Sequence, residues 1–199
     1  MRDQSIMLIS MILAITVILY VYNNAKAISA YLAGNKTMNV KSSITLNPKK
    51  IIEPVGFVLF ILFRCGWAKP QNISFYNARN SRKAILITHI APNVILLISA
   101  ILLTVFAKYF ANSVLFSEFV IQYLLLSIHF VILNLLPINP YDMNSILLYM
   151  GSPNTKRFLA DNEKLIQMVY VFVLAFNGAY FLITPIATRI ANLILWIII

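Results

Sequence analysis

Three residues of this sequence could together hold a metal ion: His89, His129 and Asp142. Zinc accepts imidazole nitrogens and carboxylate oxygens, and the bound metal would activate a water molecule for hydrolysis. Both histidines lie inside long apolar stretches, and nothing in the spacing of the three residues favours a shared site. An isolated intramembrane histidine is more often a hydrogen-bonded residue of a helix bundle. The trio therefore stands as one hypothesis beside that simpler interpretation.

The other common catalytic patterns do not occur in the chain. It contains no H-E-x-x-H, no Gly-rich phosphate loop and no serine in a G-x-S-x-G turn. A single cysteine, Cys65, excludes an internal disulfide and a cluster of thiolate ligands. The candidate chemistry therefore centres on Asp142.

Asp142 follows a break in an apolar stretch, within the run Asn134-Leu-Leu-Pro-Ile-Asn-Pro-Tyr-Asp142. Pro137 and Pro140 lack an N–H, so carbonyls upstream lose their helical partners, and a bilayer tolerates this only where protein or water covers them. An acid at such a place indicates a functional site by default. The simpler alternative is that Asp142 caps a helix over residues 144–150 at the water boundary.

The composition defines the class of protein. Of the 199 residues 60% are hydrophobic and only 11% are charged, which is not the composition of a soluble domain. The net charge of +10 would suit nucleic acid, but the basic residues lie between apolar runs, as they do in membrane proteins. We therefore expect an all-α integral membrane bundle in a lipid bilayer, with residues 1–199 as a single membrane domain and no nucleic-acid partner.

About four to six membrane segments are expected. The first apolar run continues to Gly34, a helix stop, although Ala25-Lys26-Ala27 also resembles a signal-peptide cleavage site. Residues 54–67 are too few to cross a bilayer and predict a re-entrant or interfacial segment. Val, Ile and Thr in residues 40–46 predict a small β-hairpin or sheet after the first helix. The remaining apolar runs are residues 84–107, 119–136, 165–184 and, after an interruption at Pro185, 186–199.

The basic residues predict the orientation. Residues 26–83 carry ten of the sixteen Lys and Arg side chains. The positive-inside rule places this side in the cytoplasm, which puts the N-terminus outside and the chain in the cytoplasmic (inner) membrane of the cell as a multi-pass protein.

Several short motifs occur in a recognisable order. Thr45-Leu46-Asn47-Pro48 and Gly66-Trp67-Ala68-Lys69-Pro70 are followed by the basic stretch 76–83, by Ala91-Pro92 and by the run 134–142. In this order they resemble the short bacterial branch of the site-2 protease family, the intramembrane zinc metalloproteases. The resemblance covers nearly the whole chain and implies that family's membrane fold.

The resemblance also implies which positions would hold the catalytic residues. In the family, two histidines of an H-E-x-x-H and a distant aspartate hold zinc, and the glutamate activates water. Here that register falls on Tyr22 in place of the first histidine, Asn23 in place of the glutamate and Lys26 in place of the second histidine. Asp142 alone matches its family role as a ligand. These residues supply neither a zinc site nor a base, so we expect no catalytic residue and no zinc cofactor.

The replacements suggest a structural substitute for the metal. Lys26 and Asp142 could form an ion pair across helices, and Tyr22 and Asn23 could complete a hydrogen-bonded patch. The alternative is that Lys26 extends to the interface and contacts nothing.

Three functions remain open. The leading hypothesis is a catalytically inactive pseudoprotease that binds transmembrane segments or partner membrane proteins, with residues 40–46 as a strand edge that a partner could extend. The second is an active metalloprotease with an atypical site of His89, His129 and Asp142, and the third is a small transporter or channel subunit. The residues predicted to line the partner groove all lie in the helix break: Asn134, Pro137, Asn139, Pro140 and Asp142.

Overall fold

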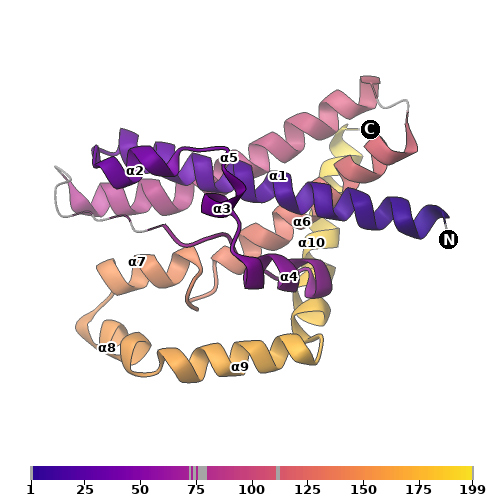
Figure 1. The fold of residues 1–199 in the computed structure, drawn as a ribbon. Helices are drawn as coiled ribbons and strands as arrows, with labels where there is room; N and C mark the ends of the chain where they lie inside the picture. The colour runs from indigo at the N-terminus through magenta and orange to yellow at the C-terminus, as the bar shows by residue number, and fades with distance from the viewer. Residues whose placement is uncertain (1, 72, 74, 76–79, 111–112, 199) are drawn as a thin grey trace.

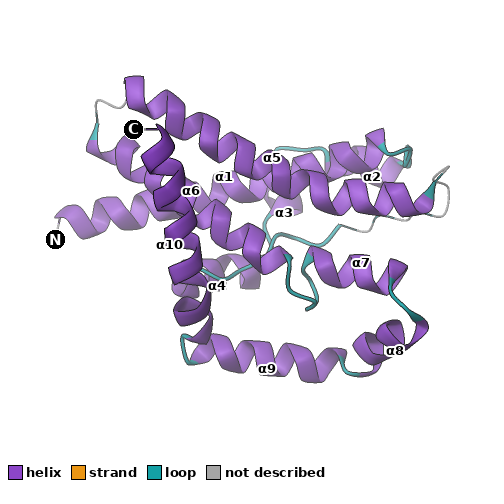
Figure 2. Ribbon diagram, turned by 180° about the vertical axis from the view of Figure 1, so that it is seen from behind, coloured by secondary structure: helices purple, strands orange, loops and turns teal. Residues whose placement is uncertain are grey.

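The computed structural model describes residues 2–71, 73, 75, 80–110 and 113–198. Within these ranges the chain forms helices joined by loops, and no strand occurs among them (Figure 2). The expectation of an all-α protein is therefore confirmed. The helices are, in chain order, α1 (Arg2–Leu32), α2 (Met38–Ser43), α3 (Pro48–Ile51), α4 (Pro54–Phe63), α5 (Ser81–Phe110), α6 (Val114–Asn134), α7 (Asp142–Met150), α8 (Pro153–Asp161), α9 (Glu163–Ala175) and α10 (Gly178–Ile198).

Helices α1, α5 and α6 form the centre of the fold and pack against one another (Figure 1). Their apolar faces meet in one core, to which α4 and α10 also contribute. The 31 residues of α1 correspond to a length of about 46 Å, which exceeds the hydrocarbon thickness of a bilayer. Fully buried members of this core are Ile15, Ile18 and Leu19 of α1, Leu96 of α5, Leu124 and Phe130 of α6, and Phe60 of α4.

Among the residues that the structure describes, four helical segments are long and apolar enough to cross a membrane, and the chain is a membrane protein. Only 17% to 50% of each segment is buried inside the protein, which leaves exposed apolar surface that lipid would cover. The segments are Gln4–Leu32, Ser81–Tyr109, Val114–Asn134 and Tyr180–Ile198.

Two predicted helix ends are confirmed. Helix α1 ends at Leu32, and Gly34 adopts a φ of 103°, which a residue without Cβ reaches easily. Helix α6 ends at Asn134 and α7 begins at Asp142, so the two prolines interrupt the apolar stretch where expected.

The predicted β-hairpin in residues 40–46 is wrong, and with it the strand edge for a partner. The first part of this segment is helix α2, which buries Val40. The second part is extended, but the side chain of Asn24 on α1 occupies the backbone of Thr45: its Nδ2 donates to the carbonyl at 3.0 Å, and its Oδ1 accepts the N–H at 2.9 Å. A side-chain amide thus takes the place of a partner strand.

Residues 54–67, predicted to be re-entrant, form the short helix α4 and a returning segment. The chain turns at Arg64, which has a φ of 55°, and comes back along the helix. A Cβ on Gly66 would lie 2.1 Å from the carbonyl oxygen of Gly56, so both glycines allow a backbone approach that no other residue permits. Ten residues of helix are too few to cross the bilayer. The depth of this segment in the bilayer stays a prediction.

The C-terminal third differs from the expected pair of segments interrupted at Pro185. Pro185 lies inside α10, and the chain instead breaks between α9 and α10, where Asn177 has a φ of 55° and precedes Gly178. A membrane helix tolerates the one lost N–H of a proline, whereas an Asn-Gly pair favours a turn. Helices α7, α8 and α9 form an arm below the central bundle, from which α10 returns to pack on α6 (Figures 1 and 2).

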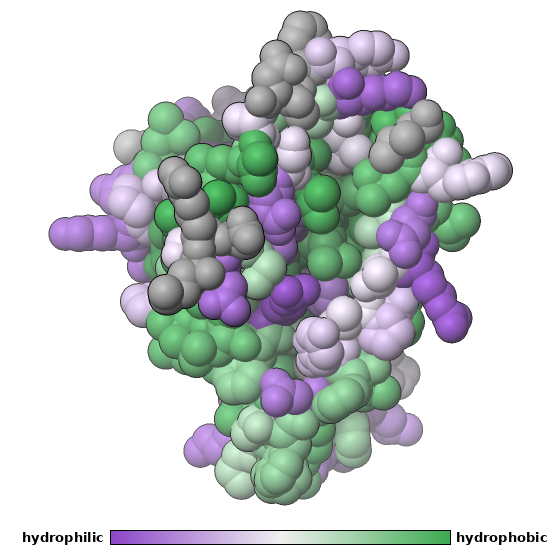
Figure 3. All heavy atoms as spheres, turned by 90° about the vertical axis from the view of Figure 1, so that its right-hand side faces the viewer, coloured by the Kyte–Doolittle hydropathy of each residue, from purple (hydrophilic) through white to green (hydrophobic). Residues whose placement is uncertain are grey.

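The surface is strongly apolar outside the loops. Figure 3 shows hydrophobic side chains over much of one end of the molecule, broken by hydrophilic patches. Large exposed side chains lie on several helices, including Leu102 of α5, Phe172 of α9 and Trp196 of α10. Such a surface fits a bilayer and does not fit water.

Candidate functional site

A buried polar site surrounds the carboxylate of Asp142, which is only 2% exposed. Its Oδ1 lies 2.6 Å from Nζ of Lys26 and 2.7 Å from Nδ1 of His89. Its Oδ2 accepts from the hydroxyl of Tyr22 at 2.6 Å and from Nδ2 of Asn93 at 2.7 Å. Since a carboxylate only accepts, Nδ1 of His89 carries the proton. We call these five residues the Asp142 cluster.

Two helices position the four donors by the same spacing. Tyr22 and Lys26 lie four residues apart on α1, and His89 and Asn93 lie four residues apart on α5. Side chains at this spacing share one helix face. Nζ of Lys26 also lies 3.3 Å from the Tyr22 hydroxyl and 5.5 Å from the centre of its ring. The two helix faces meet at the first residue of α7.

The predicted ion pair between Lys26 and Asp142 is confirmed, and the alternative of a free Lys26 is wrong. Lys26 is 8% exposed and ends on the carboxylate. The prediction that Asp142 merely caps a helix at the water boundary is also wrong, because Tyr141 is the N-cap and Asp142 is buried. Asp142 is a buried acceptor that connects α7 to α1 and α5.

The charge state of Asp142 follows from two opposing effects. Burial disfavours the carboxylate and raises its pKa, while the Lys26 ammonium and the His89 hydrogen bond lower it. The second effect is larger, and the pKa of Asp142 lies well below its usual range. Asp142 is therefore a buried anion with its charge balanced by Lys26.

Asn134 joins the cluster to the end of α6. Its Nδ2 donates to Oδ1 of Asn93 at 3.0 Å, and its Oδ1 accepts from the backbone N–H of Asp142 at 3.4 Å. With the bond from Asn93 to Asp142, these contacts close a ring of hydrogen bonds across α5, α6 and α7. The ring holds together the two ends of the helix break.

Asn23 lies outside the Asp142 cluster. Its Nδ2 donates to the carbonyl of Ile51 at 2.8 Å, and Nε2 of Gln71 donates to the backbone carbonyl of Asn23 at 2.8 Å. Of the residues at the predicted H-E-x-x-H positions, the structure therefore brings Tyr22 and Lys26 to Asp142, while Asn23 connects α1 to the end of α3 and to the loop after α4.

The proposed metal trio is wrong because His129 is engaged elsewhere. Its Nδ1 lies 2.8 Å from the carbonyl of Leu125, and its Nε2 lies 3.1 Å from the hydroxyl of Thr184 on α10. In the part of the chain that the structure describes, no group of three His, Cys, Asp or Glu residues could hold a metal ion. His129 acts as a hydrogen-bonded bundle residue, the simpler of the two interpretations.

The donors around Asp142 do not fit a zinc ion. Both carboxylate oxygens are occupied by protein donors, and one of these is an ammonium 2.6 Å away. A cation at that distance repels a second cation, and a phenol and an amide are poor zinc ligands. Cys65 offers no substitute nucleophile, because burial raises the pKa of its thiol to about 12.

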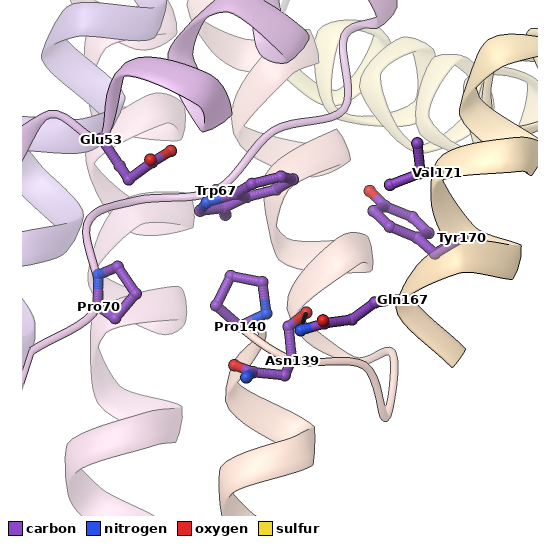
Figure 4. A pocket seen from close by; sticks show the side chains of 8 residues that line it. All are labelled: Glu53, Trp67, Pro70, Asn139, Pro140, Gln167, Tyr170 and Val171. Carbon is purple, nitrogen blue, oxygen red and sulfur yellow. Dashed lines mark hydrogen bonds between the residues drawn. The ribbon is translucent and has the colours of Figure 1, made fainter. Parts of the chain in front are cut away.

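Two cavities adjoin the helix break, on different sides of it. The first, about 360 Å³, lies between α5, α6 and α7; its walls are apolar, and His89, Asn93, Asn134 and Asp142 lie along one side. We call it the α5–α7 groove. The second, about 350 Å³, lies between α9 and the loops that carry Trp67 and Pro140 (Figure 4).

The residues predicted for a single partner groove are thus divided. Asn134 and Asp142 line the α5–α7 groove, while Asn139 and Pro140 line the second cavity. Pro137 lines neither cavity and is exposed. The helix break separates two surfaces, where the prediction assumed one.

Asn93 was missing from the predicted site, and His89 was expected in a different one. A signal for both was present: two polar residues spaced by one helical turn in an otherwise apolar span predict a polar face directed into the bundle. The same spacing of Tyr22 and Lys26 on α1 would have marked the opposing face.

The chain is similar to "Putative zinc metalloprotease YwhC" of Bacillus subtilis (strain 168). The two are 26% identical over 148 residues, which represent 70% of this chain and 68% of the relative. No family model and no solved structure matches the chain. The similarity supports a metalloprotease-like relationship for a membrane protein whose described site does not suit zinc.

Proposed function

We propose that this protein is a site-2-protease-like membrane protein that lacks zinc chemistry and binds a transmembrane segment of a partner protein. The similarity to the Bacillus relative and the order of the sequence motifs support the relationship. The observation that carries the loss of chemistry is the buried contact of 2.6 Å between Lys26 and Asp142.

In the proposed register, Lys26 stands where the second histidine ligand would be. Its ammonium supplies locally the positive charge that a metal would have brought to Asp142, so the acid remains charged in the absence of zinc. Asn23 stands in place of the general base, but a side-chain amide cannot take a proton from water and return it. This amide is also already hydrogen-bonded to Ile51 and Gln71. Both requirements of the metal-dependent reaction are missing together.

The α5–α7 groove is the proposed binding site for the partner segment. Ile90, Val94 and Leu135 on its walls are 47% or more exposed, so an apolar segment can reach them from the lipid. His89 lies at its polar side, and its Nε2, which bonds none of the described residues, can bond a backbone group of a segment that is not fully helical.

The proposed location is the cytoplasmic (inner) membrane of the cell. With four spans, residues 33–80 and 135–179 lie on the same side, and together they carry ten of the sixteen Lys and Arg residues. The positive-inside rule places these loops in the cytoplasm and the N-terminus outside.

Metal analysis of the purified full chain tests the proposal. We expect no stoichiometric zinc in the wild type and about one zinc per chain in Tyr22→His/Asn23→Glu/Lys26→His, whose added histidines complete a ligand set with Asp142. Adding Asp142→Ala to that variant should remove the metal again. Stoichiometric zinc in the wild type, lost on Asp142→Ala, would contradict the proposal.

A second experiment addresses partner binding. Val94→Trp fills the α5–α7 groove and should prevent photocrosslinking of membrane proteins from a probe at Ile90, while Leu102→Trp, an exposed position of α5 outside the groove, should not. Equal crosslinking in both variants would count against the groove. The transport alternative stays a prediction, and solute flux into liposomes containing the protein would test it.

A further inference from the structure

Helix α10 carries a charge on its outer face. Arg189 is the central residue of the candidate span Tyr180–Ile198 and is exposed. It forms neither a hydrogen bond nor an ion pair with any residue that the structure describes. Charged residues inside membrane spans normally face the bundle or a partner, so an exposed and unpaired arginine at this depth indicates a contact outside the chain.

Counted along the candidate span, both headgroup regions are too far from Arg189 to provide that contact. Either end of the span lies nine residues from Arg189, which corresponds to about 13.5 Å along the helix axis. That distance exceeds the reach of an arginine side chain, so the guanidinium does not arrive at the interface by extending along the helix.

Arg189 belongs to a regular seam of exposed residues. Leu182 is 68% exposed, Ile186 52%, Leu193 61% and Trp196 82%. With Arg189 these residues follow one another at steps of four, three, four and three, the spacing at which two helices pack side by side over their length. Only 17% of the span is buried in this protein, so the seam is free among the described residues. One polar residue in such a seam selects the partner and its register.

We propose that this seam, residues 182–196 of α10, docks a transmembrane helix of another protein that carries an aspartate or glutamate at the depth of Arg189. The carboxylate would form the ion pair that Arg189 lacks, and the apolar seam residues would pack on the partner helix on either side.

The acid has to come from a different protein. Within the candidate spans that the structure describes, Glu118 is the only acidic residue; it lies near the start of α6 and accepts a hydrogen bond from Gln122. Asp142 is buried and occupied by four donors. A second copy of the chain that paired through the same seam would place Arg189 against Arg189, which is repulsive.

The seam is separate from the α5–α7 groove, which α10 does not line. The inference therefore does not depend on the proposed function and can fail or hold independently of it.

The test uses the full chain in liposomes and synthetic transmembrane peptides of leucine and alanine with Glu, Leu or Lys at the midpoint, with binding followed by energy transfer. We expect the Glu peptide to bind about tenfold more tightly than the Leu peptide, as one intramembrane polar contact allows. Arg189→Leu should remove this preference, and Arg189→Glu should transfer it to the Lys peptide, a result that misfolding would not produce.

Matched variants complete the test. Asn192→Leu changes a neighbouring exposed polar residue of α10 and should leave the preference intact. Val94→Trp fills the α5–α7 groove and should also leave it intact, which separates this surface from the proposed function. Equal binding of the Glu and Leu peptides to the wild type would overturn the inference. So would a dimer of this chain that Arg189→Leu dissociates, because the seam would then hold a second copy.

Discussion

Lys26 and Arg189, two cations within the candidate membrane spans, have opposite surroundings. Lys26 is buried between α1, α5 and α7 and lies 2.6 Å from a carboxylate, whereas Arg189 lies on the exposed face of α10 with no partner among the described residues. The first charge is compensated inside the protein's own bundle, because its partner is in the same chain. The second costs free energy until another molecule covers it. The N-terminal bundle is thus electrostatically complete, and the C-terminal helix is not.

The largest expected effect comes from removing one charge of the Lys26–Asp142 pair. Lys26→Met leaves the buried carboxylate without its counter-charge and should lower the free energy of unfolding by about 3 to 5 kcal/mol. Asp142→Asn should cost a similar amount, since it leaves a buried ammonium unpaired. The double variant should cost clearly less than the two single losses together, as measured by denaturation in detergent. Additive losses would show that the two side chains are not coupled.

The next effect has the opposite sign and concerns the unpaired Arg189 on α10. In the absence of a partner, Arg189→Leu should favour membrane insertion of α10 by about 2.5 to 3.5 kcal/mol, the cost of an arginine at the centre of a span. A glycosylation acceptor after α10 in the full chain reports the inserted fraction. No change in that fraction would mean that the arginine is already satisfied, and the contrast with Lys26 would fail.

A smaller effect is the dependence of stability on pH. The folded pKa of Asp142 is below the unfolded value of about 3.9, so the unfolded chain binds the proton more readily. This stabilisation is fully present above about pH 5 and is lost as the pH falls, by up to about 1.4 kcal/mol per pH unit. Asp142→Asn should remove that part of the pH profile. An unchanged profile in the variant would assign the acid sensitivity to other groups.

The smallest effect concerns the hydrogen bond between α6 and α10. Thr184→Val removes the hydrogen bond from α10 to His129 and should lower stability by about 0.6 kcal/mol, the average for an intramembrane hydrogen bond. Thr188→Val, one turn further along α10, is the matched control and should have little effect. A large loss for Thr184→Val would mean that α10 is fixed to the bundle more firmly than one hydrogen bond implies.

Much of the bundle could be predicted from the sequence, because hydropathy and helix breakers act locally. The spans of α1, α5 and α6, the stop at Gly34 and the break between Asn134 and Asp142 all follow from such signals. The extent of α10 was predicted wrongly. A proline usually marks a helix break, but here the chain breaks at the turn-forming Asn177 and Gly178, and Pro185 lies inside the helix. The hairpin failed because a side chain of α1 provides the bonding that the prediction assigned to a second strand.

Part of the site was predicted and part was missed, and the reason is physical. The pair of Lys26 and Asp142 followed from the motif register, which relates residues far apart in the chain. His89 and Asn93 complete the cluster through the rotation of α5 about its axis, which depends on packing against α1 and α6. The basic stretch 76–83 lies partly outside the described residues, so the motif that precedes α5 is not tested as a whole.

The closed ring of hydrogen bonds from Asn93 to Asn134 to Asp142 has a mechanical consequence. It spans the groove at its polar end, and one of its bonds ends on a buried anion. Spreading α5, α6 and α7 apart would break contacts to a charged group that is only 2% exposed. We therefore expect the groove to keep a fixed width at this end, so that the proposed partner segment would have to match its shape.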